Sequence, residues 1–329
     1  PMLEAIGAAR SSIALSSYIF RADAAGNAFI AALAAARRRG VEVRVLIDGI
    51  GGNYLLSPAY HRLRAEGIQA ARFLHSPLPW RMPFLNLRNH KKILVVDGQM
   101  GFTGGLNIGA ENILADNPRH PVRDTHFRVE GPVIAQLMEA FAEDWLFATG
   151  ESLSGPAWFP PLTDVGGIAA RVVTSGPDQD VEKLESVLLN AIAVARRTIR
   201  IASPYFLPDD RLCSALEMSA LRGIEVDIVI PAKGNHTVLD WAVPTQIRPL
   251  VAAGCRVWHA PPPFVHSKLM AVDGCWALVG SANWDVRSLR LNFELDLEVY
   301  SEAFATEIDA AIDTRRRRRV ILADLDQRS

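Results

Sequence analysis

The segment Arg39–Ile47 (RGVEVRVLI) and the later segment Arg222–Ile230 (RGIEVDIVI) share one pattern. Each has a glycine, Gly40 or Gly223, directly after a helix-forming stretch, at the position where glycine commonly caps a helix. The run of β-branched and other apolar residues after each glycine predicts a buried strand. Helices that alternate with continuous apolar strands are typical of α/β layering around a mostly parallel or mixed sheet.

Three further pairs of segments repeat in the same order along the chain. They are Ala9–Leu15 with Ala195–Ile201, Ala65–Ile68 with Ala252–Cys255, and His90–Lys92 with His266–Lys268. The first pair leads into β-branched strands that we expect over residues 13–20 and 199–206. Ordered matches of this kind predict a duplicated fold. The Gly-, Pro- and Ser-rich stretch Gly150–Pro161 predicts a linker between the two copies. We therefore expect two α/β domains, residues 1–160 and 161–329.

The composition restricts the classes of function. A length of 329 residues with 49% hydrophobic content fits two folded domains and excludes general disorder. Lys and Arg number 35 against 36 Asp and Glu, a formal net charge of -1, which gives no overall basic surface for bulk nucleic acid. Three cysteines without a CxxC pair argue against a disulfide framework and a structural zinc site. An anionic substrate is therefore expected to meet local cations.

Both copies contain the pattern H-x-K-x4-D-x6-G-[GS]-x-N. The first copy supplies His90, Lys92, Asp97 and Asn107, and the second supplies His266, Lys268, Asp273 and Asn283. A histidine and a lysine two residues apart on a strand point to the same face, so both can reach one ligand. The glycine of each pattern lets the backbone of the turn come close to that ligand. The pattern therefore predicts two matching half-sites.

The residue types of the pattern suit phosphoryl chemistry. An imidazole can attack phosphorus as a neutral nucleophile, and the P–N bond that results is labile enough for a second displacement. Lysines and asparagine N–H groups can neutralise a phosphodiester, and a second histidine can protonate the leaving alcohol. A lone histidine in a strand is usually a packed or surface residue, but two copies at matching positions reverse that interpretation. A metal site fits poorly, because lysine is a poor ligand and each motif holds one histidine. We expect neither a metal nor another cofactor.

The paired motifs resemble the HKD signatures of the phospholipase D superfamily, and in particular its bacterial cardiolipin synthase branch. The resemblance covers almost the whole chain. The segments that carry it, besides the two motifs, are Asn86–Asn89, Gly104–Gly109, Arg123–His126, Glu130–Pro132, Ser203–Asp209, Ser281–Ser288 and Asn292–Glu294. One departure is Gly105, which stands where a serine is more usual in the family.

The resemblance implies two pseudo-twofold-related α/β/α sandwich domains, with mixed sheets and flanking helices, around one metal-free site. It also implies a phosphohistidine intermediate on one motif histidine, with the other as general acid and base. His90 is the expected nucleophile and His266 the expected acid and base, although the reverse assignment stays open. The other expected roles are phosphate binding by Lys92, Lys268, Asn107 and Asn283, a structural role for the signature residues Asp97 and Asp273, and orientation of His90 by Glu294 and of His266 by Asp124.

By the same resemblance, we expect a phosphatidyltransferase that passes a phosphatidyl group to a second lipid such as phosphatidylglycerol, giving cardiolipin and glycerol. A phospholipase D hydrolase, in which water accepts the group, is an alternative that the sequence does not separate. A nuclease of the same superfamily is disfavoured by the near-neutral charge and by the prolines and aromatics beside both motifs, so we expect no nucleic-acid partner. A non-catalytic scaffold is disfavoured because every expected catalytic residue is present.

Three features bear on contact with a membrane. The Pro-rich segments Ser76–Leu85 and Pro261–Val265 precede the two motifs, and each is either a loop packed on its own domain or an apolar rim that meets acyl chains. The run Arg315–Arg319 is either a solvated face or a patch for anionic headgroups. No run of about 18 apolar residues is present. We expect a peripheral protein of the bacterial cytoplasmic membrane, with any anchor upstream of Pro1.

Overall fold

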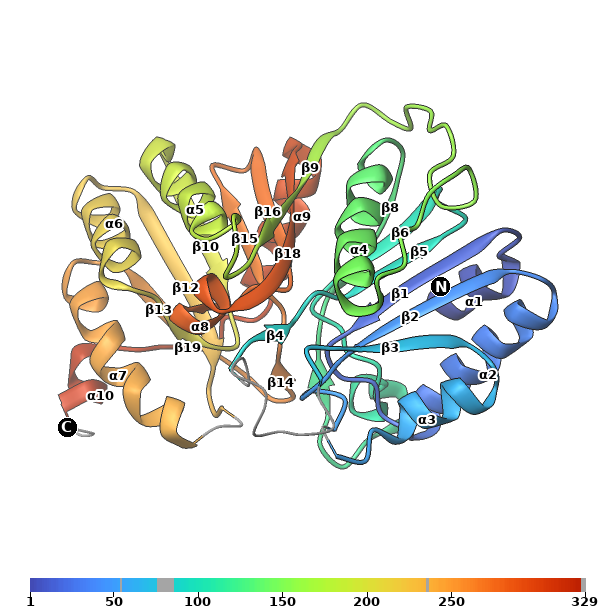
Figure 1. Cartoon of the computed structure of the whole chain (residues 1–329). Coiled ribbons are helices and arrows are strands. Elements are labelled where there is room, and N and C mark those ends of the chain that lie inside the picture. The colour runs from blue at the N-terminus through green and yellow to red at the C-terminus, as the bar shows by residue number, and fades with distance from the viewer. Residues whose placement is uncertain (54, 76–85, 235–236, 327–329) are drawn as a thin grey trace. The chain divides into compact units, whose positions relative to one another are not determined.

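The computed structural model describes residues 1–53, 55–75, 86–234 and 237–326 (Figure 1). Contacts divide the chain into two compact units. Unit 1 comprises residues 1–121, 126–167 and 292–295, and unit 2 comprises residues 122–125, 168–291 and 296–329. Two short segments, 122–125 and 292–295, therefore belong to the unit opposite to the one that surrounds them in the sequence.

Unit 1 is built on a mixed sheet. Its strands are β1 (Ser12–Ser17), β2 (Glu42–Asp48), β3 (Gln69–Phe73), β5 (Ile93–Val96), β6 (Met100–Gly104) and β8 (His126–Glu130), in the order β3-β2-β1-β5-β6-β8. β1, β2 and β3 are parallel, whereas β5 is antiparallel to β1 and to β6, and β6 is antiparallel to β8. Parallel neighbours need crossover helices, which explains the helix-strand alternation of the first half.

Helices cover both faces of this sheet. They are α1 (Met2–Ala8), α2 (Ala24–Arg38), α3 (Pro58–Ala65) and α4 (Val133–Thr149). α1, α2 and α3 pack with one face of the strands in a core that includes Ile13, Leu33 and Val45. α4 contacts β1, β3, β5, β6 and β8 and is buried through Leu137 and Phe141, on the other face of the sheet (Figure 1). Two short 3-10 helices, η2 (Ala110–Asn112) and η3 (Leu114–Asp116), follow β6.

Unit 2 repeats this arrangement. Its main strands are β10 (Thr198–Ala202), β12 (Glu225–Pro231), β13 (Arg256–Ala260), β15 (Leu269–Val272), β16 (Trp276–Gly280) and β18 (Asn292–Tyr300), in the order β13-β12-β10-β15-β16-β18. β19 (Arg318–Arg319) extends the sheet beside β13, and β9 (Ala169–Ser175) pairs with β18. Each of the six main strands corresponds in order and pairing to a strand of unit 1. The duplication expected from the sequence is therefore present in the strand topology.

The helices of unit 2 also form two layers. They are α5 (Lys183–Val194), α6 (Asp210–Leu221), α7 (Thr237–Ala252), α8 (Val286–Arg290), α9 (Glu302–Asp313) and α10 (Leu322–Asp326). α5 and α6 contribute to the core with Ile201 and Ile228 of the sheet, whereas α9 contacts β10, β15 and β16. This confirms the predicted mixed α/β architecture with flanking helices. No helix of the described residues is long and apolar enough to cross a membrane.

The predicted first strand of each copy is longer than the observed one. We expected strands over residues 13–20 and 199–206, but β1 ends at Ser17 and β10 at Ala202. The hydroxyl of Ser17 donates to the carbonyl of Ile19 at 2.8 Å, and that of Ser203 donates to the carbonyl of Tyr205 at 2.7 Å. Each hydrogen bond turns the chain out of the sheet, because a serine hydroxyl that bonds a nearby backbone group competes with the strand ladder.

Candidate functional site

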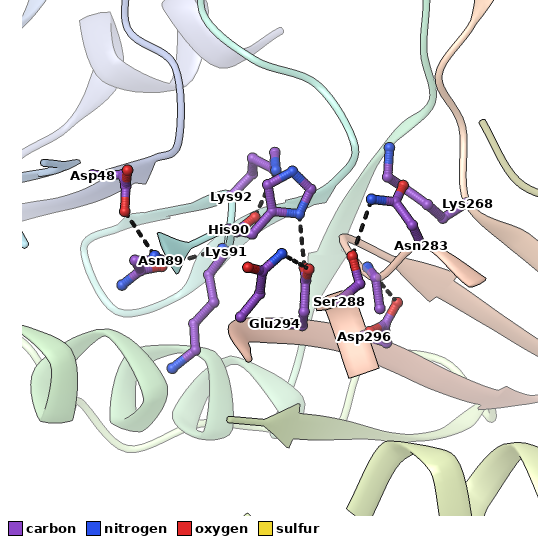
Figure 2. Close-up of polar contacts among 12 residues, drawn as sticks. Asp48, Asn89, His90, Lys91, Lys92, Lys268, Asn283, Ser288, Glu294 and Asp296 are labelled. Carbon is purple, nitrogen blue, oxygen red and sulfur yellow. Dashed lines mark hydrogen bonds and ion pairs between the residues drawn. The ribbon is translucent and has the colours of Figure 1, made fainter. Parts of the chain in front are cut away.

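The first motif histidine is held beside a segment from the other end of the chain. β4 (Arg88–Asn89) runs parallel to the start of β18, and the backbone N–H of His90 donates to the carbonyl of Phe293 at 2.9 Å. This register brings Glu294 next to His90, with Nδ1 of the ring 2.8 Å from Oε2 (Figure 2). The Glu294 side chain is fully buried, and its Oε1 accepts a hydrogen bond from Nδ2 of Asn292 at 3.0 Å. The carboxylate is thus fixed on both oxygens.

The Glu294 contact sets the chemistry of the His90 ring. A carboxylate that accepts from Nδ1–H fixes the tautomer in which Nε2 carries the lone pair. The ring of Tyr18 packs edge-on against the imidazole, with centroids 4.8 Å apart and planes at 68°. His90 itself is only 6% exposed, so its rotation is restricted by packing as well as by hydrogen bonding. Such an imidazole is pre-oriented for attack through Nε2.

Two further residues of the first motif lie within the same unit. Lys92 is buried, its Nζ donates to the carbonyl of His90 at 2.6 Å, and the ammonium lies 5.4 Å from the Tyr18 ring centroid. Oδ1 of Asn107 accepts from the backbone N–H of Ile19 at 3.2 Å. The amide oxygen is thus held by the backbone, and the amide N–H groups are the donors that this side chain can offer a ligand. The first candidate half-site therefore comprises His90, Glu294, Lys92, Asn107 and Tyr18.

The second motif is assembled in the same way in unit 2. β14 (Phe264–Val265) runs parallel to β7 (Val122–Arg123), and the N–H of His266 donates to the carbonyl of Arg123 at 2.8 Å. This register places Oδ2 of Asp124 at 2.7 Å from Nδ1 of His266. Both histidine–carboxylate pairs expected from the resemblance are therefore present, each built by one of the segments that cross to the other unit.

The Asp124 carboxylate stays ionised although its side chain is fully buried. Burial raises the pKa of Asp124, but the charge of His266, the hydrogen bond from its ring and the charge of Lys268 outweigh burial and lower the pKa to about 2. An ionised carboxylate favours the imidazolium form of its partner. Asp124 can therefore support a proton on His266, as a general acid requires.

The other residues of the second half-site are Lys268, Asn283 and Tyr205. Nζ of Lys268 donates to the carbonyl of His266 and lies 3.1 Å from Nε2 of the ring. Nδ2 of Asn283 donates to Oγ of Ser288 at 3.1 Å (Figure 2). The Tyr205 ring lies edge-on to His266, with centroids 6.2 Å apart. Neither tyrosine was singled out from the sequence as a site residue. The sequence feature that could have identified both tyrosines is their position, one to three residues after the first strand of each repeat.

The two motif aspartates lie at the other end of their strands. Asp97 lies five positions after Lys92, a span of about 16 Å along an extended strand. The Asp97 carboxylate accepts from the backbone N–H groups of Arg10, Ser11 and Ser12 at 2.7–3.0 Å. Burial raises the pKa of Asp97, but these donors outweigh it and lower the pKa. Asp97 therefore ties the start of β1 to the end of β5.

Asp273 occupies the same place in unit 2. Its carboxylate accepts from the backbone N–H groups of Arg196, Arg197 and Thr198 at 2.7–2.9 Å. Both Asp97 and Asp273 have a positive φ of 54°, a left-handed conformation that aspartate tolerates better than most residues. The matched geometry indicates one structural task in the two copies.

A buried polar network that the sequence did not reveal lies under the first motif. Nζ of Lys91 donates to Oδ1 of Asp144 on α4 at 3.0 Å, and Nδ2 of Asn89 donates to Oδ2 of the same carboxylate at 2.8 Å. The N–H of Asn89 donates to Oδ2 of Asp48 at 2.7 Å (Figure 2). Burial raises the pKa of Asp48 to about 6, against backbone donors that lower it. This network holds β4 and the residue that follows His90.

The arginine run near the C-terminus is not a single surface feature. Arg315 is 8% exposed, and Nη2 of Arg316 lies 3.1 Å from the buried Asp227. Arg317, Arg318 and Arg319 are exposed, and Arg318 pairs with Asp324 at 2.6 Å. The expectation of one uniform solvated face or headgroup patch was therefore wrong for the first two members, which point into the unit.

The remaining sequence predictions bear on loops and metals. The predicted apolar rim Ser76–Leu85 lies outside the described residues. Its counterpart Pro261–Val265 is described, and its last two residues form β14. Within residues 1–53, 55–75, 86–234 and 237–326, no group of three or more histidine, cysteine or carboxylate side chains could hold a metal ion.

Comparisons with known proteins identify the relatives of this chain. A family described as cardiolipin synthase, PLD-like domain, matches residues 2–145 and 188–316. Cardiolipin synthase A of Pseudomonas aeruginosa (strain LESB58) is 39% identical over 312 residues, which are 95% of this chain and 63% of the relative. Cardiolipin synthase 1 of Bacillus anthracis is 36% identical, over 93% of this chain and 62% of the relative. The chain thus spans just under two thirds of the length of these relatives.

Solved structures with the same fold include two proteins of low sequence identity. The phosphatidylserine synthase of Haemophilus influenzae Rd KW20 has a TM-score of 0.73 at 15% identity, over 97% of this chain and 84% of that one. The polyphosphate kinase of Porphyromonas gingivalis has a TM-score of 0.63 at 15% identity, over 96% of this chain and 48% of that one. At such identities the likeness concerns the fold alone.

Proposed function

This chain belongs to the family described as cardiolipin synthase, PLD-like domain, and from this premise we propose that it is a phosphatidyltransferase that works through a phosphohistidine. The observation that carries the proposal is the matched pair of histidines, each with Nδ1 on a buried carboxylate and with a motif lysine beside it. Two imidazoles oriented in this way suit a double displacement at phosphorus, in which one is the nucleophile and the other moves the proton.

In the proposed first step, Nε2 of His90 attacks the phosphorus of a phospholipid. A P–N bond forms and the P–O bond to the headgroup alcohol breaks, while the His266 imidazolium gives its proton to the leaving oxygen. Lys92 and Lys268, with the amides of Asn107 and Asn283, stabilise the charge that develops on the phosphoryl oxygens. Glu294 stabilises the His90 ring as positive charge builds on it during the attack.

In the proposed second step, the hydroxyl of a second lipid attacks the phosphorus. Neutral His266 accepts the hydroxyl proton, the new P–O bond forms, and the P–N bond to His90 breaks. With phosphatidylglycerol as both donor and acceptor, the products are cardiolipin and glycerol. With water as the acceptor, the same steps give phosphatidic acid, which is the hydrolase alternative.

The proposal includes peripheral contact with the bacterial cytoplasmic membrane. In unit 1 the loops after β2 and β6 and the residues before β5 lie at the same end of the strands. This follows because β2 runs parallel to β1, whereas β5 runs antiparallel to both β1 and β6. Leu55 and Leu56 on the first loop are 78% and 70% exposed, and Ile113 and Leu114 on the second are 38% and 39% exposed. Exposed apolar side chains at the end of the strands that carries His90 support access to lipid.

The test is to incubate the protein with vesicles of phosphatidylglycerol in EDTA and to analyse the lipids. We expect cardiolipin and glycerol from the wild type and neither from His90→Ala, while His61→Ala, which changes an exposed histidine on α3, behaves as the wild type. Phosphatidic acid without cardiolipin would replace the transferase by the hydrolase. A requirement for metal, or cleavage of DNA or RNA with no lipid product, would overturn the proposal.

A further inference from the structure

A chain of three polar side chains lies beside the second motif. Ser267 stands between His266 and Lys268, in the three residues that connect β14 to β15. The Ser267 hydroxyl is 2.6 Å from Oγ1 of Thr125, and Nη2 of Arg315 donates to the same Oγ1 at 3.1 Å. Thr125 directly follows Asp124, and both belong to the segment 122–125 that crosses to unit 2.

Arg315 is a buried cation with incomplete hydrogen bonding. It follows α9 and is 8% exposed, and its buried Nη1 has no hydrogen-bond partner within the part of the chain that the structure describes. Burial lowers the pKa of the guanidinium, and the charge of Asp124 opposes that effect. An arginine stays protonated in proteins, so this position holds a positive charge at any assay pH. Burial of such a charge costs free energy, and Asp124 is the anion that offsets part of the cost.

We propose that Arg315 is a positioning residue of the second half-site, which fixes the segment that carries Asp124 and weakens the negative field of Asp124 at His266. The first effect acts through Thr125 and Ser267, which join Arg315 to both sides of the Asp124–His266 pair. The second effect is electrostatic and needs no direct contact with the ring. This role deepens the proposed function and rests on it, because the second half-site must both donate and accept a proton.

The balance of charges around His266 explains why a cation is useful there. A general acid and base works best when its pKa lies near the working pH. Asp124 favours the protonated ring, whereas the second step needs His266 as a base. Three cations lie around the Asp124–His266 pair. Lys268 is next to the ring and also interacts with Asp124. Arg315 interacts with Asp124 and is repelled by Arg123.

The test is an NMR titration of His266 in the full chain with labelled histidine, its signals assigned by their loss in His266→Ala. We expect Arg315→Gln to raise the pKa of His266 by about 0.5–1 unit, since one nearby positive charge is removed. Arg317→Gln is the matched control, because it removes an exposed arginine two residues away. We expect this variant to shift the pKa by less than about 0.2 unit, since solvent and salt screen exposed charges. Arg315→Lys should restore a value near that of the wild type.

Equal shifts in Arg315→Gln and Arg317→Gln, or no shift in either, would overturn the inference. If Arg315→Gln does not fold, Thr125→Val and Thr125→Ser separate the hydroxyl from the shape of the side chain. We then expect Thr125→Val to lower kcat about tenfold with little change in KM, and Thr125→Ser to retain activity. Full activity of Thr125→Val would contradict the positioning role. The titration needs no turnover, so a wild type without transferase activity refutes the proposed function, whereas an unresponsive His266 in an active enzyme refutes the role of Arg315.

Discussion

The two half-sites agree closely on the face that carries the histidine and differ on the face beneath it. In both, a short parallel strand pair brings a carboxylate to Nδ1, and the lysine two residues on bonds the carbonyl of the histidine. The residue between them is Lys91 in one copy and Ser267 in the other. Lys91 forms a buried ion pair with Asp144 on α4, whereas Ser267 reaches Arg315, just after α9, through Thr125.

A second position of the repeat also differs in charge. Arg44 on β2 and Asp227 on β12 occupy equivalent places in the repeat. Arg44 pairs with Glu151 at 2.6 Å and packs on Trp158, whereas the fully buried Asp227 binds Arg256 at 2.7 Å and accepts from Trp258. The backbone and the histidine face are thus alike in the two copies, while the charged contacts elsewhere in the repeat differ. Beneath the first motif Lys91 is paired with Asp144, whereas the cation Arg315 bonds Thr125 beneath the second.

The largest expected effect separates the roles of the histidines. We expect His90→Gln and His266→Gln each to lower kcat for cardiolipin formation by about 10⁴-fold, because each removes a group that acts in the transition state. The two variants should differ with a substrate whose leaving group needs no proton. With such a substrate, His266→Gln retains covalent adduct formation and His90→Gln does not, as measured by mass spectrometry of the quenched protein. The opposite pattern would exchange the two roles.

The support beneath the motifs should differ in its contribution to stability. Lys91→Met leaves Asp144 without its cation, and a broken buried pair costs about 3–5 kcal/mol. Ser267→Ala removes one hydroxyl contact and should cost about 1 kcal/mol. Urea unfolding of both variants measures the difference, and Lys91→Met/Asp144→Leu should recover much of the loss. Equal losses of unfolding free energy in Lys91→Met and Ser267→Ala would contradict the expected difference between the two supports.

The carboxylate partners should have matched effects on activity. Glu294→Gln and Asp124→Asn each keep the shape of the side chain but lose the charge that orients and stabilises the imidazole, and we expect kcat to fall by about 10²–10³-fold in each. The substitutions are compared under single-turnover conditions, with circular dichroism to verify the fold. A large loss in one variant and none in the other would show that one histidine does not depend on its carboxylate.

The pH dependence of stability should distinguish two buried aspartates. Burial raises the pKa of Asp48 in the folded protein to about 6, so the folded state holds its proton more tightly than the unfolded state does. Asp48 therefore stabilises the fold below about pH 4, and up to about 3 kcal/mol is lost as the pH rises to about 6. The contribution of Asp124 to stability changes with pH in the opposite direction. Its folded pKa is lowered to about 2, so its contribution is present above about pH 4 and is lost as the pH falls toward 2.

Urea unfolding between pH 4 and 7 measures these contributions. Asp48→Asn should remove the decline of stability across this window, because the titrating group is gone. Asp124→Asn should keep the decline between pH 4 and 6, because that decline belongs to Asp48 and Asp124 itself is ionised in both states over most of this range. A wild-type curve that shows no decline between pH 4 and 6, or that Asp48→Asn does not alter, would contradict the assignment to Asp48.

Much of the fold and of the ligand-facing chemistry could be predicted from the sequence. The strand segments around Val43 and Val226 repeat with their capping glycines, and repetition of a local pattern is enough to predict a repeated sheet. The motif spacing predicted that His90 lies with Lys92 and His266 with Lys268, and each lysine does bond the carbonyl of its histidine. The expectation that they lie on a strand was wrong, because both triplets connect two strands. The partners Glu294 and Asp124 came from the family resemblance, because nothing in local sequence indicates that these segments cross to the opposite unit.

The supporting residues could not be predicted in the same way. Lys91 and Ser267 look interchangeable in the pattern H-x-K, and their partners Asp144 and Thr125 lie 53 and 142 residues away in sequence. A run of like charges such as Arg315–Arg319 is normally exposed, and only the end of α9 shows that its first two members turn inward. Long-range packing decides these contacts, and it leaves little trace in a short window of sequence.

The central claim is that one phosphatidyl transfer proceeds through His90, with His266 as the acid and base. The most direct measurement is to mix the wild type with phosphatidylglycerol vesicles in EDTA, quench in alkali to preserve phosphohistidine, and locate the adduct by mass spectrometry of the digested chain. We expect a phosphatidyl group on the peptide that contains His90, formed and consumed at the rate of cardiolipin production. An adduct on His266, or cardiolipin formed with no adduct on either histidine, would contradict it.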